Sequence, residues 1–209
     1  MNKTLHFLSG LPRSGSTVLA AILNQNPETH VSTTSGLVHA LDSLANIWAQ
    51  DKLLGENDPK RKRLAQTMRG VINSFYEDTE ENIIIDKARA WPFTHILSAM
   101  EQVLNRKPKI IATVRSVPDC AASFVRIAKP EDMNEFMYSS QLIRHVKSSY
   151  AILQSGYAYD SECFLFIEYD NLLANPKKEL GRIHKFLDLD AFEYDFDKLD
   201  GSTVQENDE

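Results

Sequence analysis

The sequence is poor in the features that mark several large classes of protein. Its 209 residues contain only two cysteines, Cys120 and Cys163, which are too few for a disulfide framework or a four-ligand metal site, and we expect both to be buried thiols. No apolar run approaches the roughly 20 residues of a membrane-spanning helix. Ser9, Gly10 and Pro12 interrupt the first apolar stretch too early for a secretory leader. We therefore expect a cytoplasmic protein with no membrane partner.

Glycine and proline are also scarce, with eight of each, which excludes collagen-like and low-complexity chains. Hydrophobic residues make up 43% of the sequence, which is enough to build a core. No repeat and no linker-like composition divides the chain. We therefore expect a single domain over residues 1–209.

Basic charge is in the minority, and the formal net charge is −6. The charge is unevenly spread: residues 188–209 hold nine acids and one lysine, which leaves 22 bases against 20 acids in the rest. The only concentrated basic run, residues 60–63, falls at the expected start of a helix and is interpreted as a solvated face, so no nucleic-acid partner is predicted. The slightly basic body remains compatible with a small anionic ligand.

Short apolar, β-branched stretches alternate with segments of helical spacing. Such alternation predicts an α/β fold of three layers, in which a parallel sheet is flanked by helices on both faces. Ligands of these sheets bind beyond the carboxyl ends of the strands, so the residues that follow each strand are the candidates for a site. The expected strands are 4–8, 83–85, 109–114 and 163–167, and the expected helices are 16–24, 36–49, 59–76, 92–105, 118–127, 134–154 and 176–186.

The segment 9–17 joins the first apolar strand to an apolar helix and reads Ser-Gly-Leu-Pro-Arg-Ser-Gly-Ser-Thr. Glycines let such a loop turn tightly and expose backbone N–H groups, and the following helix adds its positive dipole end. The segment therefore predicts a phosphate-binding loop, and an ordinary strand-to-helix turn is the alternative.

Against the Walker A pattern, Gly10, Gly15 and Thr17 fit, but Ser16 stands where the lysine should be. That lysine normally reaches the terminal phosphates of a triphosphate, so its absence counts against an ATPase, GTPase or kinase. Arg13 supplies a cation at a different point of the loop, which suits a 5′-phosphate and the group attached to it.

The loop resembles a known family at this point. The segment 12–17, Pro-Arg-Ser-Gly-Ser-Thr, is similar to the 5′-phosphosulfate loop of the tyrosylprotein and related bacterial sulfotransferases, which read Pro-Arg-Ser-Gly-Thr-Thr. These enzymes use 3′-phosphoadenosine 5′-phosphosulfate (PAPS) and release adenosine 3′,5′-bisphosphate (PAP). The resemblance implies a fold like that of the P-loop NTPases. It also implies that Arg13, Ser14, Gly15, Ser16 and Thr17 hold the 5′-phosphosulfate and that Arg13 stabilises charge on the bridging oxygen.

Arg115 ends another expected strand, and Ser123 follows eight positions later on a helix that begins near Pro118. The spacing would let the guanidinium and the hydroxyl converge on one anion, although an arginine at a strand end often pairs with an acid instead. The same sulfotransferases carry an Arg and a Ser at this spacing, where the two hold the 3′-phosphate of the nucleotide. The resemblance assigns that role to Arg115 and Ser123, and it separates a PAPS user from ATP-binding proteins because ATP has no 3′-phosphate.

Two further residues match the family pattern. Lys87 follows the apolar run 83–85, where a solvated strand end is the alternative, and the resemblance implies that its ammonium stabilises charge that develops during transfer. Tyr169 lies in the segment 166–172, which is similar to the Tyr-Glu-x-Leu segment of the family, and we expect it to contact the adenosine. Its alternative is a half-buried core tyrosine.

The general base cannot be carried over from the family. Where the tyrosylprotein enzymes have a catalytic glutamate, this chain reads Ser-Thr-Thr-Ser over 32–35, and the other known pattern, Lys-x-His, would require histidine at Arg89. Three candidates remain, of which we select His39 over His30 and Asp42. Arg89 and His95 are either acceptor-orienting residues or surface residues.

From about residue 190 the chain no longer follows the family, and we expect truncation or disorder there. The sequence predicts a PAPS-dependent sulfotransferase without a metal, which acts on a hydroxyl or amine of a small molecule or polymer. The alternatives are a non-catalytic protein that still binds PAP or PAPS, and a P-loop phosphotransferase that uses ATP.

Overall fold

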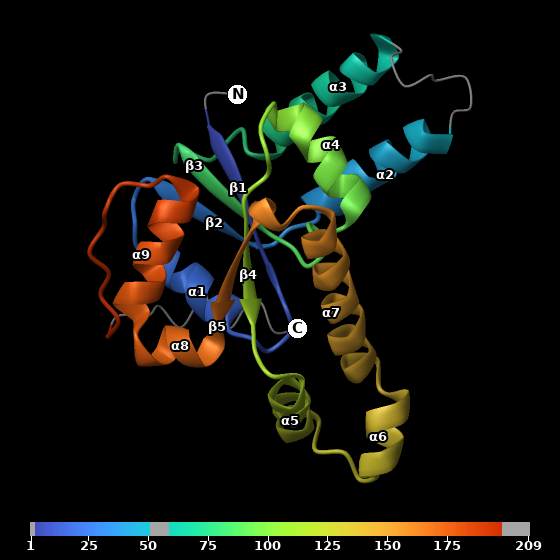
Figure 1. Ribbon diagram of the computed structural model, residues 1–209, viewed down its shortest axis with the longest axis vertical. Helices are drawn as coiled ribbons and strands as arrows, with labels where there is room; N and C mark the ends of the chain where they lie inside the picture. Colours follow the sequence, from blue (N-terminus) through green and yellow to red (C-terminus); the bar gives the residue numbers. More distant parts are fainter. Residues whose placement is uncertain (1–2, 51–58, 198–209) are drawn as a thin grey trace.

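A computed structural model describes residues 3–50 and 59–197 and shows one parallel sheet of five strands (Figure 1). The strand order is β2-β3-β1-β4-β5, and every neighbouring pair is parallel. The predicted α/β fold with a central parallel sheet is therefore confirmed. The strands are β1 (Thr4–Gly10), β2 (Thr29–Thr34), β3 (Ile83–Lys87), β4 (Ile110–Val114) and β5 (Phe164–Glu168).

Helices cover both faces of the sheet, which gives the three layers (Figure 1). One face carries α1 (Ser16–Leu23), α8 (Tyr169–Ala174) and α9 (Pro176–Leu187), and the other carries α2 (Leu37–Gln50), α3 (Pro59–Phe75), α4 (Thr94–Leu104) and α7 (Gln141–Tyr159). Two more helices, α5 (Val117–Ala128) and α6 (Met133–Ser139), lie beyond the carboxyl end of β4 (Figure 1).

Alternating side chains of each strand build two separate cores, because successive residues of a strand point to opposite faces. On β1, Phe7 packs into the core under α2, α3 and α4, while Leu8 packs against α1 and α9. The same division separates Ile110 from Ile111 on β4. Since helices cover both faces, the carboxyl ends of the strands are the place where a parallel sheet of this kind binds a ligand.

One local prediction was wrong, and two elements were not expected. The sequence reasoning missed β2, whose residues are mostly polar, because its Thr29 and Ser32 are buried by neighbouring elements rather than by their own hydropathy. The helix expected over 134–154 is divided into α6 and α7 at Ser140, which is extended and accepts a hydrogen bond from the Leu142 N–H as the cap of α7. The short helix α8, directly after β5, was not expected either.

The first residues of the acidic segment 188–209 pack along α9. Tyr194 is buried there, its hydroxyl lies 2.7 Å from Nε2 of His184, and burial raises its pKa to about 12. The rest of the segment, residues 198–209, lies outside the described residues. Within the described ranges, no helix combines the length and apolar character needed to cross a membrane.

Candidate functional site

The loop between β1 and α1 follows a path that depends on glycine at two positions. A Cβ on Gly10 would lie 2.2 Å from Oγ1 of Thr113, so only glycine lets β1 end this close to β4. Arg13 and Gly15 both have left-handed backbone conformations, with φ of 65° and 86°. Together they turn the chain into the N-terminus of α1, where unpaired backbone N–H groups collect.

Ser14 fixes this loop from the inside. Its hydroxyl is buried and lies 2.5 Å from the carbonyl oxygen of Leu11, 2.9 Å from that of Thr113 and 2.7 Å from Oγ1 of Thr113. The sequence reasoning grouped Ser14 with the residues that hold an anion. In the structure its hydroxyl anchors the loop to β4, and a role of Ser14 in holding an anion stays a prediction.

Three cationic residues lie at the carboxyl ends of neighbouring strands. Lys87 is the last residue of β3, Arg13 follows β1 and Arg115 follows β4, and these three strands are adjacent in the order β3-β1-β4. The strand that lies between β1 and β3 in sequence, β2, is at the edge of the sheet and does not separate them. Their positive charge is therefore concentrated at the carboxyl ends of these three strands.

Lys87 contacts the helix that follows the loop. The residue is only 7% exposed, and its Nζ donates a hydrogen bond to Oγ1 of Thr17 over 3.1 Å. The backbone N–H of Lys87 donates to Oγ of Ser32 on β2 over 2.8 Å. These bonds hold the ammonium group beside the first turn of α1.

Arg13 and Ser123 meet although the sequence placed them at two different sub-sites. Nε of Arg13 donates to the Ser123 hydroxyl over 3.2 Å. This bond joins the loop after β1 to the helix α5 beyond the carboxyl ends of β1 and β4. The structure therefore brings Arg13, predicted to hold the 5′-phosphosulfate, next to Ser123, predicted to hold the 3′-phosphate.

Arg115, which follows β4, and Tyr169, which follows β5, form a second contact between the segments at the strand ends. The guanidinium carbon of Arg115 lies 4.6 Å from the centre of the Tyr169 ring, and the Nε atom of Arg115 is buried without a hydrogen-bond partner. The same ring packs on the loop, because a Cβ on Gly15 would lie 2.4 Å from Cδ2 of Tyr169. Tyr169 is therefore in contact with both predicted anion positions.

The three candidates for a general base lie on two elements. His39 is exposed in the first turn of α2, and Asp42 lies on the same helix with its Oδ1 2.5 Å from Nε2 of His95 at the start of α4. His30 is the second residue of β2, with its ring at the edge of Tyr76. The pairing of Asp42 with His95 was missed, since nothing in the sequence links residues 53 positions apart.

Asp86 is a second feature that the sequence reasoning missed. This carboxyl group is fully buried, accepts a hydrogen bond from Nε1 of Trp91 over 2.8 Å and another from the Tyr76 hydroxyl, and burial raises its pKa. Burial and the nearby Asp86 raise the pKa of Tyr76 as well. The cluster fixes the end of β3 immediately before Lys87. An acid inside an apolar run, as in Ile-Ile-Ile-Asp, is the signal that could have pointed to it.

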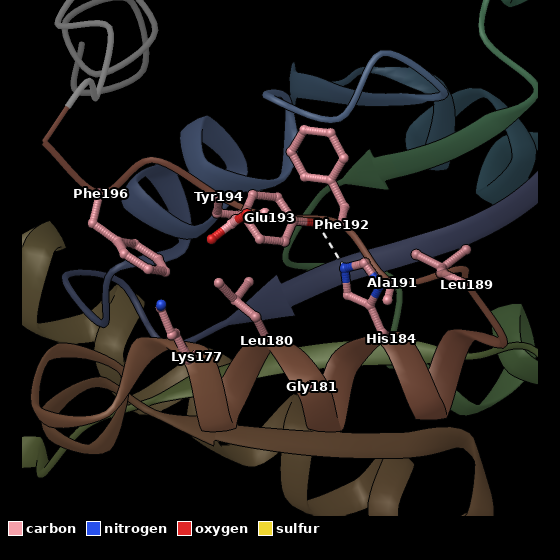
Figure 2. A pocket seen from close by; sticks show the side chains of 10 residues that line it. All are labelled: Lys177, Leu180, Gly181, His184, Leu189, Ala191, Phe192, Glu193, Tyr194 and Phe196. Carbon is pink, nitrogen blue, oxygen red and sulfur yellow. Dashed lines mark hydrogen bonds between the residues drawn. The ribbon is translucent and has the colours of Figure 1, made fainter.

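Two cavities differ in their relation to these residues. The larger, about 580 Å³, lies between α9 and residues 189–196, and none of the predicted site residues lines it (Figure 2). Both ring nitrogens of its His184 have partners, the carbonyl of Asp190 at 2.5 Å and the hydroxyl of Tyr194 at 2.7 Å. The smaller, about 380 Å³, is lined by Arg115 and therefore adjoins the site.

In the part of the chain that the structure describes, no group of three or more His, Cys, Asp or Glu side chains could hold a metal ion.

Solved structures with the same fold are sulfotransferases. The sulfotransferase domain of the Synechococcus PCC 7002 olefin synthase is 22% identical, with 91% of this chain and 74% of that chain covered and a TM-score of 0.56. The sulfotransferase from Alicyclobacillus acidocaldarius is 13% identical, with 98% and 89% covered and a TM-score of 0.60. Mouse sulfotransferase SULT7A1, in a complex with PAP, is 15% identical, with 99% and 65% covered and a TM-score of 0.54.

A search of curated protein sequences gives no match. The model of the Sulfotransferase family matches residues 7–194, which include the loop after β1 and all the cationic residues at the strand ends. The fold is that of the P-loop NTPases, as in the solved sulfotransferases. The match covers most of the chain, and the protein therefore belongs to the sulfotransferase family.

Proposed function

We propose that this transferase moves the sulfuryl group of PAPS to a hydroxyl or amine of an acceptor. The observation that carries the proposal is the contact between Arg13 and Ser123, which joins the phosphate-binding loop to the arginine and serine pattern after β4. A ligand that fits both parts needs two anionic groups on one nucleoside. PAPS has them at its 5′ and 3′ positions, whereas ATP has none at the 3′ position.

The 5′-phosphosulfate is assigned to the loop after β1. The left-handed residues Arg13 and Gly15 turn backbone N–H groups toward the N-terminus of α1, and Ser16 and Thr17 add hydroxyls in its first turn. Lys87 already donates to Thr17, so its ammonium lies beside the same position. This donor set suits an anion with many oxygens and provides positive charge without a Walker lysine.

The 3′-phosphate is assigned to Arg115 and Ser123. The buried Nε of Arg115 has no protein partner, and a buried donor of this kind is costly unless a ligand accepts from it. The ring of Tyr169 lies against the same guanidinium and offers an aromatic face to the adenosine. The complex of the mouse sulfotransferase with PAP supports the choice of nucleotide.

In the proposed reaction the acceptor oxygen or nitrogen forms a bond to sulfur as the bond from sulfur to the bridging 5′-phosphate oxygen breaks. PAP leaves with the electron pair of that bond, and Arg13 and Lys87 stabilise the charge on the bridging oxygen. The proton of the acceptor passes to a base, for which His39 remains our prediction. The pair of His95 and Asp42 is the alternative that the structure adds, because the Asp42 carboxylate holds the His95 imidazole in a fixed orientation.

The test is calorimetry with PAP, adenosine 5′-phosphate and Mg-ATP on the wild-type protein and on Arg115→Ala. We expect PAP to bind most tightly and Arg115→Ala to remove most of the advantage of PAP over adenosine 5′-phosphate. Arg126→Ala, which changes an exposed arginine of α5, is the matched control and should bind PAP like the wild type. Tighter binding of Mg-ATP, or no gain from the 3′-phosphate, would contradict the proposal.

A second assay distinguishes the enzyme from a protein that only binds the nucleotide. Transfer of label from PAPS to a mixture of alcohols, phenols, amines and sugars measures turnover directly. We expect label to reach at least one class of acceptor. Tight PAP binding with no transfer to any of them would instead favour the non-catalytic alternative.

A further inference from the structure

The residue before Lys87 carries a buried carboxyl group that has no role in the reaction proposed above. Asp86 is the fourth residue of β3, it is fully buried, and the three residues before it are isoleucines. An acid is costly in such a place, and an apolar side chain of similar size would fill the same space at less cost. We therefore looked for a task of Asp86 that packing alone does not supply.

Asp86 and Lys87 point to opposite faces of the sheet, as successive residues of a strand do. The partners of Asp86, Tyr76 and Trp91, belong to the core under α2, α3 and α4. Lys87 instead reaches Thr17 of α1, which covers the other face. Asp86 is therefore turned away from the position assigned to the 5′-phosphosulfate, and an effect on transfer has to pass through its neighbour.

The carboxyl group of Asp86 ties the end of β3 to two other segments. Its Oδ1 accepts a hydrogen bond from Nε1 of Trp91 over 2.8 Å, and its Oδ2 accepts one from the Tyr76 hydroxyl. Tyr76 directly follows α3, and Trp91 lies between β3 and α4 with its ring centre 4.2 Å from that of Phe7 on β1. All these side chains are buried. A buried polar network whose members are paired is rigid, so the strand end is held in one place.

The main chain of Lys87 is held from the side of β2. Its N–H donates to Oγ of Ser32 over 2.8 Å, and its carbonyl oxygen accepts from the N–H of Ser35 over 2.9 Å. Burial raises the pKa of Asp86, and a hydrogen bond from the Ser35 side chain is the first of the contacts that oppose this rise. Ser35 thus connects the carboxyl group of Asp86 to the main chain of Lys87. Only the side-chain torsions of the lysine are left to move its ammonium group.

We propose that Asp86 is a positioning residue for Lys87, whose ammonium it keeps beside Thr17 and the sulfuryl group by fixing the end of β3. The inference rests on the proposed transfer from PAPS, in which Lys87 stabilises developing charge. A displacement of about 1 Å in a reacting geometry can cost about 100-fold in rate, so a residue that does not touch the substrate can still change kcat.

The first test replaces Asp86 by leucine, which removes both acceptor oxygens and keeps a side chain of similar size. With the best acceptor of the transfer assay, we expect Asp86→Leu to lower kcat about tenfold or more and to change PAP affinity less than about twofold. Asp86→Asn retains an oxygen that can accept from Trp91, so it should keep more of kcat than Asp86→Leu. Glu179→Leu removes another buried carboxyl group, on α9, and should keep the kcat of the wild type.

A double variant tests whether Asp86 acts through Lys87. If it does, Asp86→Leu should lower kcat in the wild type but have little further effect in the Lys87→Met background. Tyr76→Phe and Trp91→Phe each remove one donor of the network and should also lower kcat, by less than Asp86→Leu. They keep the inference testable if chemical denaturation shows that Asp86→Leu is not folded.

A second readout needs no turnover. Limited acetylation with acetic anhydride, read by mass spectrometry of the peptides, should label Lys87 slowly in the wild type because the residue is 7% exposed and bonded to Thr17. In Asp86→Leu we expect Lys87 to be labelled several times faster, since a loosened strand end exposes it. Lys147, at an exposed position of α7, should be labelled at the same rate in both proteins.

The outcomes separate this inference from the proposed function. If the wild type neither binds PAP nor transfers label, the proposed function fails, and the acetylation of Lys87 still decides whether Asp86 holds it. The inference is overturned if Asp86→Leu keeps both the kcat and the labelling rate of the wild type. It is overturned as well if Asp86→Leu lowers kcat by the same factor with and without Lys87, or if Glu179→Leu lowers kcat equally.

Discussion

Arg13 donates a hydrogen bond from Nε to the hydroxyl of Ser123, 110 residues further along the chain. Without this contact, a loop after β1 and a serine on α5 would be two unrelated features. With it, they are neighbours at the carboxyl ends of β1 and β4.

Removal of the Ser123 hydroxyl should weaken PAP more than adenosine 5′-phosphate. Ser123→Ala loses one hydrogen bond to the proposed 3′-phosphate, and we expect PAP affinity to fall about fivefold, which corresponds to roughly 1 kcal/mol. Calorimetry with both nucleotides measures the difference. Ser148→Ala changes a serine on the exposed side of α7 and serves as the control. An equal loss for both nucleotides would argue against a role in 3′-phosphate binding.

A side chain at Gly15 should damage both stability and nucleotide binding. In Gly15→Ala the new Cβ is strained at φ 86° and meets the Tyr169 ring at 2.4 Å. We expect a loss of at least about 1 kcal/mol in the free energy of unfolding, from the backbone strain alone. Chemical denaturation measures it. Gly70→Ala, in α3 where a Cβ meets nothing within 4 Å, should instead be neutral or stabilising.

The double variant Gly15→Ala/Tyr169→Ala separates the two causes. If the clash with the ring contributes, the double variant should be more stable than the sum of the two single effects predicts. Strict additivity would mean that the Tyr169 ring moves away at no cost.

Replacement of Lys87 should affect turnover more than nucleotide binding. Lys87→Met removes the ammonium that stabilises charge during transfer, and we expect kcat to fall about 100-fold or more. PAP affinity, measured by calorimetry, should change much less. Lys147→Met, on the exposed face of α7, is the matched control. A Lys87→Met protein that retains most of its kcat would remove Lys87 from the proposed mechanism.

Acidification should destabilise the fold through His6 on β1. Burial, and to a lesser extent the charges of Arg106 and Lys109, lower its pKa to about 3. Between pH 6.5 and about 3, the unfolded chain binds a proton that the folded protein excludes. The free energy of unfolding should therefore fall with acidification by up to about 1.4 kcal/mol per pH unit from this group.

Chemical denaturation at pH 6.5 and at pH 5 measures this effect. His6→Leu should lose less stability than the wild type between the two values, because leucine takes up no proton. His145→Leu, at an exposed position of α7, is the control. The role of His6 would be contradicted if His6→Leu and the wild type lost the same amount.

Much of the candidate site could be proposed from the sequence because its signals are local. A strand, a glycine-containing loop and a helix N-terminus follow one another in the sequence, and Arg115 and Ser123 lie within two turns of a single helix and its start. The strand β2 was missed for the opposite reason. Thr29 and Ser32 are buried only because α1 and β3 cover them, and a polar sequence does not reveal its neighbours.

The parallel α/β fold, the loop with serine in place of a Walker lysine, and the cations at the strand ends could all be inferred from the sequence. These follow from residue type and spacing along the chain. The contact of Arg13 with Ser123, the packing of Tyr169 on Gly15 and the cavity between Arg115 and α7 became visible in the folded chain alone. Such contacts depend on the order of strands in the sheet and on helix packing, which bring together residues that no local pattern relates.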